Sequence, residues 1–140
     1  MAAVGAAAVP TAGRSLLVMP APSSTDGTDS PWDGQRVLVT GGAGFLGRRV
    51  VARLAERGAD VRAPRSIEFD LTRPVTAEAM LAEHDASGVV HLASDVGGIG
   101  YNLYHPDRLY LSTLLMGTHG IEAARHATGV DKTVLVVTVC

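Results

Sequence analysis

One short stretch, residues 37–47, limits the folds open to this chain more than any other. An apolar run from Val37 to Val39 stops at Thr40, and glycines follow at positions 41, 42, 44 and 47. A helix-like sequence begins at Phe45. Glycine tolerates sharp turns and close backbone contacts because it carries no Cβ. The stretch therefore predicts a buried strand, a tight turn and a helix in direct succession.

The glycines fit two overlapping patterns, Gly-x-Gly-x-x-Gly from Gly42 and Gly-x-x-Gly-x-x-Gly from Gly41. In such patterns the first glycine allows the turn, the middle one lets a pyrophosphate approach, and the last lets the helix pack closely on the sheet. The pyrophosphate binds the free N–H groups and positive dipole end of the helix. Because a strand precedes the motif and a helix follows it, we predict a dinucleotide-binding site. The expected contact residues in this motif are Gly41, Gly44, Phe45, Leu46 and Gly47.

The rest of the chain alternates between strand and helix patterns. We expect strands at residues 36–40, 59–63, 89–92 and 132–139, and helices at 45–57, 75–84 and 106–128. This alternation predicts an α/β fold, a Rossmann-like doubly wound parallel sheet of which the chain holds the first half, through the fourth strand. We expect the strand order 3-2-1-4, with the ligand at the carboxyl ends of the strands where the order reverses. We also expect residues 67–71 to be extended, residues 93–102 to form a loop, and Thr72 to cap the second helix.

Residues 1–33 differ in composition from the remainder. They are rich in Ala, Pro, Ser, Thr and Gly, and Arg14 is their single basic residue. A secretory signal would need a charged n-region, and an organelle transit peptide would ordinarily contain more arginine. We therefore expect a disordered extension over residues 1–33, and an incomplete dinucleotide-binding domain over residues 34–140.

The bulk composition argues against several classes of partner. A net charge of −2 and a pI of about 6.2 do not suggest nucleic acid or an anionic membrane surface. No apolar run approaches the roughly 20 residues of a membrane span. The single cysteine, Cys140, cannot form an internal disulfide and fits a reducing compartment, so we expect a cytoplasmic location. We expect no metal site.

The end of the second predicted strand bears on the choice between NAD and NADP. An acidic residue there binds the ribose 2′-hydroxyl, whereas an arginine accepts a 2′-phosphate. The sequence places Arg65 and Ser66 at this end, while Asp60 opens the strand and Glu68 lies past it. We therefore expect NADP as the cofactor and NAD as the second choice, with Arg48 as another candidate for the phosphate. The alternative is that Arg65 is a solvated loop cation.

Two further segments offer candidate cofactor contacts. Asp70, in the segment Asp70-Leu71, could accept a hydrogen bond from the adenine amino group, or it could simply stabilise a turn. Small residues after the third strand would let the chain pass close to a cofactor, in the segment Leu92-Ala93-Ser94. His91, at the strand end, is more often a hydrogen-bonded structural residue in such a place than a catalyst. Glycines at 97, 98 and 100 suggest either close approach to a ligand or a flexible loop.

These motifs together carry a resemblance to a known family. Thr-Gly-Gly-Ala-Gly-Phe-Leu-Gly at 40–47, Asp-Leu at 70–71 and His-Leu-Ala-Ser at 91–94 resemble the extended short-chain dehydrogenase/reductases of the NAD-dependent epimerase/dehydratase family. Residues 95–100 and 138–140 resemble in particular its GDP-L-fucose synthase branch, the GDP-4-keto-6-deoxy-D-mannose epimerase/reductases. The resemblance spans residues 35–140.

The resemblance implies a mechanism. NADPH would bind the first half of the sheet, a 4-keto sugar nucleotide would be epimerised at C3 and C5, and hydride transfer would reduce C4. Thr138 matches the catalytic Ser/Thr that hydrogen-bonds the keto oxygen, and Cys140 matches the epimerisation cysteine, a proton-transfer residue. Without the resemblance, this segment would be a buried strand end, where cysteine acts as a small hydrophobe.

The sequence departs from the family pattern in three places. No tyrosine has a lysine four residues later, and Lys132 is the only lysine, so the family's Tyr-x-x-x-Lys pair is absent from the 140 residues. Ser112 stands at a helix position where relatives usually carry asparagine, and Val137 stands where they commonly carry glycine. We expect the missing pair beyond Cys140, and therefore expect this chain to be the cofactor-binding portion of an enzyme, as a fragment or a degenerate copy.

Two other functions remain open on the sequence. The chain could belong to another NAD-dependent sugar epimerase/dehydratase, or it could be a non-catalytic nucleotide-binding module. A nucleotide sugar is the expected substrate partner of the full-length protein. The family homodimer uses helices around the missing pair, so we do not expect it here. Residues 134–137 would lie at a sheet edge, and we expect the isolated chain to self-associate through them.

Overall fold

The computed structural model describes residues 30–136 as a four-stranded parallel sheet with helices on both faces. The strands are β1 (Arg36–Thr40), β2 (Asp60–Arg62), β3 (Gly88–His91) and β4 (Lys132–Leu135). The helices are α1 (Phe45–Ala55), α2 (Pro74–His84), α3 (Ile99–Tyr104) and α4 (Pro106–His126). The alternation along the chain confirms the predicted Rossmann-like α/β fold.

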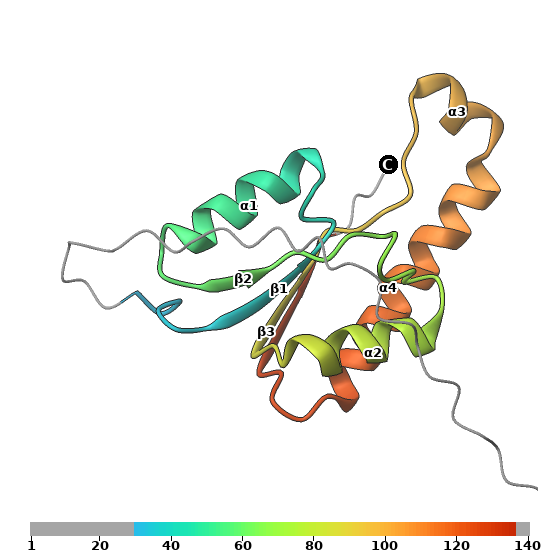
Figure 1. Ribbon diagram of the computed structural model, residues 1–140. Helices are drawn as coiled ribbons and strands as arrows, with labels where there is room; N and C mark the ends of the chain where they lie inside the picture. Colours follow the sequence, from blue (N-terminus) through green and yellow to red (C-terminus); the bar gives the residue numbers. More distant parts are fainter. Residues whose placement is uncertain (1–29, 137–140) are drawn as a thin grey trace, which may run out of the picture.

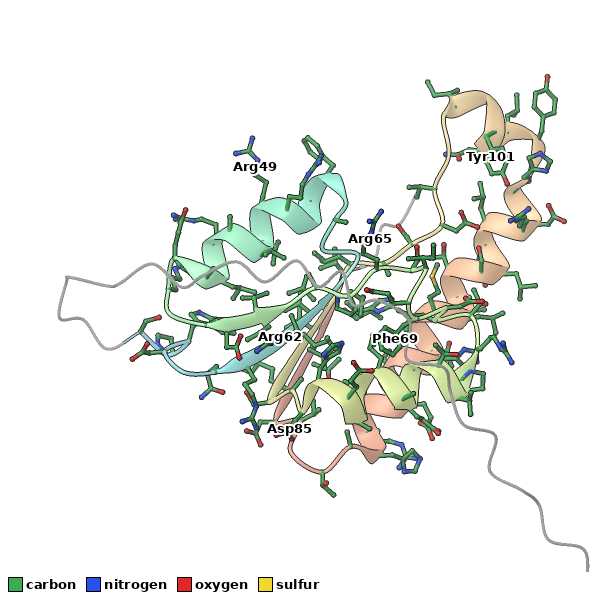
Figure 2. All side chains as sticks on the ribbon, in the orientation of Figure 1. Arg49, Arg62, Arg65, Phe69, Asp85 and Tyr101 are labelled. Carbon is green, nitrogen blue, oxygen red and sulfur yellow. The ribbon has the colours of Figure 1, made fainter. Side chains whose placement is uncertain are left out.

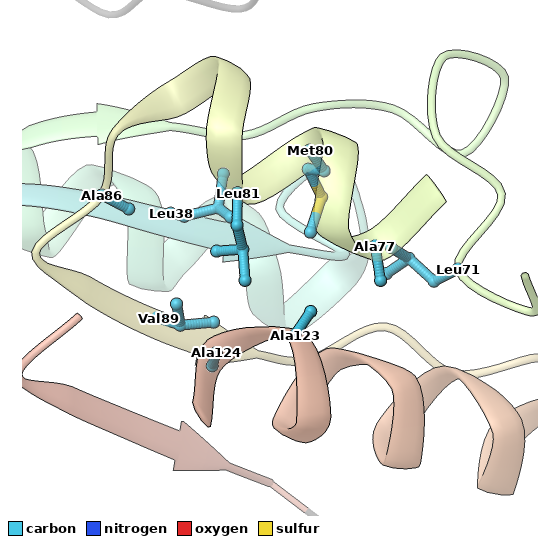
Figure 3. Packing of buried hydrophobic residues seen from close by; sticks show 9 residues of the cluster. All are labelled: Leu38, Leu71, Ala77, Met80, Leu81, Ala86, Val89, Ala123 and Ala124. Atoms are coloured by element: carbon cyan, nitrogen blue, oxygen red, sulfur yellow. The ribbon is translucent and has the colours of Figure 1, made fainter. Parts of the chain in front are cut away.

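The central strand β1 separates two apolar layers. Val37 and Val39 pack with Val51 and Leu54 of α1 on one face of the sheet. Leu38 points to the other face, where it packs with α2 and α4 (Figures 1 and 3). The three β1 side chains are at most 1% exposed. Their consecutive burial explains why the sequence shows an unbroken apolar run instead of an alternating one.

The strand order is β2-β1-β3-β4, so the predicted order 3-2-1-4 is wrong. The reason lies in which face each helix covers. Because α1 and α2 lie on opposite faces, two right-handed crossovers carry the chain in opposite directions, placing β2 on one side of β1 and β3 on the other. The point where the order reverses therefore lies between β1 and β3.

The segment between β2 and α2 also differs from expectation. Residues 67–71 do not form an extended stretch: the N–H groups of Glu68 and Phe69 donate to the Arg65 carbonyl at 2.9 and 3.1 Å, which closes a turn. The N-cap of α2 is Arg73 and not Thr72. Thr72 instead donates both its N–H (3.0 Å) and its hydroxyl (2.7 Å) to Asp70 Oδ1, a local turn that competes with helix capping.

Other boundaries are close to those predicted. Gly58 follows α1 with a φ of +89°, the left-handed conformation expected of a glycine that ends a helix. A short helix, α3, begins inside the predicted loop 93–102. Residues 1–29 of the predicted extension 1–33 lie outside the described residues. Residues 137–139 of the predicted strand 132–139 also lie outside them.

The strand β4 is exposed along its whole length. It pairs with β3 alone among the described strands, with Gly88 opposite Lys132 and His91 opposite Leu135. Val134, Leu135 and Val136 are 41%, 37% and 46% exposed. This agrees with the sheet edge expected from the sequence, while self-association through it stays a prediction. No helix within residues 30–136 is long and apolar enough to span a membrane.

Candidate dinucleotide-binding site

The turn between β1 and α1 is built so closely that side chains would not fit. Gly41 has a φ of +70°, and a Cβ there would lie 2.8 Å from the backbone nitrogen of Ala93. A Cβ on Gly42 would lie 2.6 Å from the Cβ of Ala63, and one on Gly47 would overlap the carbonyl oxygen of Gly41. The glycines thus let the turn, the loop after β3 and the first turn of α1 share one compact site.

The amino end of α1 is open toward solvent. Its N-cap is Gly44, which has no side-chain cap, and the first intrahelical hydrogen bond runs from Arg48 N to the Gly44 carbonyl at 3.1 Å. The N–H groups of residues 45–47 precede that bond and are therefore not used by the helix. Phe45 is 85% exposed and Leu46 is also exposed, so the first side chains of α1 face solvent. Free N–H groups and the helix dipole make it a binding site for an anion.

A buried hydrogen bond joins the carboxyl ends of β1 and β3. Thr40 lies opposite His91 in the sheet, and its Oγ1 is 2.9 Å from His91 Nδ1. The same oxygen accepts a bond from Ala93 N at 3.4 Å. Burial lowers the pKa of the His91 imidazole, although a hydrogen bond to the Ala93 backbone partly offsets the effect, so the ring is neutral at pH 7. His91 thus has the geometry of a structural residue.

The helix α4 closes over the same histidine. Gly120 is buried, and a Cβ at this position would lie 3.3 Å from His91 Nδ1. A larger residue would therefore push the imidazole from its place beside Thr40. No local sequence pattern indicates the contacts of Thr40 and Gly120 with His91, because these contacts join residues far apart in the chain.

The segment after β2 carries the cation Arg65, and between Asp60 and Glu68 it has no carboxylate. Asp60 lies at the start of the strand and forms an ion pair with Arg62 at 3.0 Å. Pro64 is buried and Arg65 is exposed, with its backbone N–H donating to Glu68 Oε2 at 2.8 Å. Figure 2 shows the Arg65 side chain beside the carboxyl end of the sheet, whereas that of Arg49 points outward from α1.

Asp70 and Leu71 are neighbours in the chain but lie in different surroundings. Asp70 is exposed, and hydrogen bonds from the Thr72 hydroxyl and N–H lower the pKa of its carboxyl, so it is ionised at neutral pH. Leu71 is buried in the core with α2, which leaves its side chain unavailable to a ligand. Its carbonyl oxygen lies 3.1 Å from Nδ1 of His119 on α4.

A cavity of about 640 Å³ lies between the Asp70 turn, the loop after β3 and the first half of α4. Its lining residues are Asp70, Thr72, Asp95, Asp107, Arg108, Leu111, Ser112 and Leu115. The glycine-rich turn does not line this cavity, so the cavity is distinct from the place where an anion would meet α1. Ala93 is half-buried and Ser94 exposed in the loop between the two places.

Two predicted site residues, Thr138 and Cys140, lie outside the described residues. Between residues 30 and 136, no group of three or more His, Asp or Glu side chains is arranged to hold a metal ion.

Comparison with known proteins agrees with this geometry. Residues 37–140 match the family model described as the NAD dependent epimerase/dehydratase family. A GDP-L-fucose synthase of Azorhizobium caulinodans is 37% identical over 73 residues, which is 52% of this chain and 23% of that protein. A probable dTDP-4,6-dihydroxy-2-methyloxan-3-one 4-ketoreductase of Streptomyces antibioticus is 49% identical over 59 residues, 42% of this chain and 20% of that protein.

Solved structures show the same fold. The GDP-L-fucose synthetase of Naegleria fowleri bound to NADP matches with a TM-score of 0.61 and 24% identity, over 72% of this chain and 33% of that one. This chain spans between 20% and 34% of the length of the curated relatives it matches. The likeness therefore concerns one part of those proteins.

Proposed function

Because this chain belongs to the NAD-dependent epimerase/dehydratase family, we propose that it forms the cofactor-binding portion of an NADP-dependent sugar-nucleotide epimerase/reductase. The observation that carries the proposal is the turn at residues 41–47, where glycines without room for a Cβ adjoin the open amino end of α1. The residues present therefore fit a dinucleotide pyrophosphate.

The cofactor would be held by residues from three segments. Gly44, Phe45, Leu46 and Gly47 would bind the pyrophosphate through backbone N–H groups, with Gly41 allowing the turn. Asp70 would accept a hydrogen bond from the adenine, and the backbone of Leu92, Ala93 and Ser94 would line the path of the cofactor past β3. When bound, the nicotinamide supplies the hydride that reduces a keto sugar.

We favour NADP over NAD because of the charges near β2. Arg65 follows the strand and Arg48 lies on the first turn of α1, so two exposed guanidinium groups are available for a 2′-phosphate. The one carboxylate of β2, Asp60, is at the opposite end of the strand and is paired with Arg62. The solved relative from Naegleria fowleri, which binds NADP, supports the same choice.

The proposed substrate is a GDP-linked 4-keto-6-deoxy sugar, as in the GDP-L-fucose synthases that this chain resembles. Thr138 would hydrogen-bond the keto oxygen, and Cys140 would transfer a proton during epimerisation at C3 and C5. The single cysteine supports a cytoplasmic location for the protein.

A second candidate is 4-keto reduction without epimerisation, which the likeness to the 4-ketoreductase favours. Substitution of Cys140 distinguishes the epimerase/reductase from the simple reductase. The experiment uses a protein that contains this chain together with a Tyr-x-x-x-Lys pair. Cys140→Ser should abolish exchange of solvent deuterium into C3 and C5 if the protein is an epimerase. An enzyme that oxidises NADPH with a 4-keto sugar but never exchanges those protons is a simple reductase.

Calorimetric titration of the 140-residue chain with NADP and NAD tests cofactor binding. NADP should bind more tightly, and Arg65→Ala should reduce its advantage about tenfold, the effect of losing a charged hydrogen bond. Arg49→Ala is the matched control, since Arg49 is also exposed but points away from the site. Failure of both dinucleotides to bind would contradict the proposal, and an equal effect of the two arginine substitutions would contradict the assignment of Arg65.

A further inference from the structure

Asp95, in the loop that follows β3, is held by two consecutive residues of α4. The Ser112 hydroxyl lies 2.9 Å from Asp95 Oδ2. The Asp95 N–H donates to Thr113 Oγ1 at 3.1 Å, and the Thr113 hydroxyl lies 3.5 Å from the Asp95 carbonyl oxygen. All three residues are half-buried. One residue of the loop is therefore fixed to the helix through both its side chain and its backbone.

The Ser112 hydroxyl has a choice of acceptors. It lies 2.9 Å from the Asp95 carboxylate, 2.8 Å from the Arg108 carbonyl and 3.3 Å from the Leu109 carbonyl. A hydroxyl has one proton to donate, and an ionised carboxylate is a stronger acceptor than a carbonyl. The bond to Asp95 joins the loop to α4, whereas the two carbonyls would only bond the helix to itself.

The chain on either side of Ser94 is thus anchored to two different elements. Ala93 donates its N–H to Thr40 of β1, and its backbone lies against Gly41. Asp95 is fixed to α4. Ser94 is exposed between these anchors, which hold it relative to the glycine-rich turn.

We propose that Asp95 is a positioning residue, which acts through Ser112 and Thr113 to hold Ala93 and Ser94 beside the dinucleotide site. This inference rests on the proposed function, because it assigns Ser94 to that site. Asp95 does not touch the cofactor in this account. It sets the position of the residues that do.

The test combines hydrogen exchange with titration of NADP into the 140-residue chain. Asp95→Ala should raise amide exchange in residues 93–98 about tenfold or more and weaken NADP binding about fivefold, while exchange in β1 stays unchanged. Asp95→Asn should retain both properties, because its side-chain carbonyl still accepts a bond from Ser112. Ser112→Ala should reproduce Asp95→Ala, and combining the two should add little.

Asp107→Ala is the matched control. Asp107 lines the same cavity as Asp95 but has no hydrogen bond to the loop among the described residues. Its removal changes the charge of the cavity equally and should leave exchange in residues 93–98 unchanged.

Three results would overturn the proposal: exchange in Asp95→Ala equal to that of the wild type, equal loss of affinity in Asp107→Ala, or no rescue by Asp95→Asn. A wild-type chain that does not bind NADP would contradict the proposed function instead. In that case the exchange data alone still decide whether Asp95 anchors the loop.

Discussion

The interior of the sheet and its β4 edge differ in how completely they are built. In the interior, β1 is buried on both faces and its carboxyl end opens into a preformed turn. On the β4 side, each residue of the strand is exposed and several apolar side chains face solvent. The contrast indicates that the dinucleotide site and the stability of the domain both depend on β1, whereas β4 contributes little to either in this chain.

The largest expected difference in stability is between alanine substitutions of two leucines, one on β1 and one on β4. Leu38→Ala should destabilise the domain by about 2–5 kcal/mol, because it leaves a cavity between β1 and the helices α2 and α4. Leu135→Ala, on β4, should change stability by less than about 1 kcal/mol. Denaturant unfolding measures both. Equal losses would show that β4 belongs to the same cooperative core.

A smaller effect is expected at the turn itself. Gly41→Ala places a Cβ at a left-handed backbone position and against the backbone of Ala93. It should lower stability by about 1–3 kcal/mol and should weaken NADP binding. Gly100→Ala is the control, because Gly100 is helical, exposed and surrounded by open space. A Gly41→Ala variant with unchanged stability and NADP binding would mean that the turn has room for a Cβ, contrary to the structure.

The pH dependence of unfolding tests the buried histidine. Burial lowers the pKa of His91 in the folded chain below 6.5, whereas the unfolded chain titrates at its ordinary value. Its contribution to stability is therefore present above pH 6.5 and is lost as the pH falls below it, by at most about 1.4 kcal/mol per pH unit. His91→Gln should flatten the curve between pH 5 and 7. An unchanged slope in His91→Gln would refute burial of this histidine as the cause of the pH dependence.

The smallest change in stability, about 0.5 kcal/mol or less, is expected for Val134→Lys on β4. Its effect should appear in association, because a charge on an edge strand opposes pairing with another chain. Sedimentation velocity should show a larger monomer fraction than in the wild type. Ile67→Lys replaces an exposed apolar residue outside β4 and should not have this effect. A wild-type chain that is monomeric at all concentrations would contradict the expected self-association through β4.

Local features of the fold could be predicted from the sequence, and features that depend on distant contacts could not. The glycine-rich turn and the turn at Gly58, shortly after α1 ends at Ala55, follow from backbone conformations that glycine adopts easily. The strand order was missed because it depends on the face to which α2 packs. The helix α3 was missed because three neighbouring glycines suggested a loop. The hydrogen bond between Ser112 and Asp95 joins residues 17 positions apart, and no local sequence pattern predicts it.

The central claim is that the dinucleotide binds at the turn between β1 and α1, and amide chemical shifts of the 140-residue chain titrated with NADP test it most directly. The account predicts that the largest shifts fall on residues 44–48, with smaller ones at Ser94 and almost none in β4. Shifts confined to β4, or the absence of any shift at residues 44–48 at saturating NADP, would contradict it.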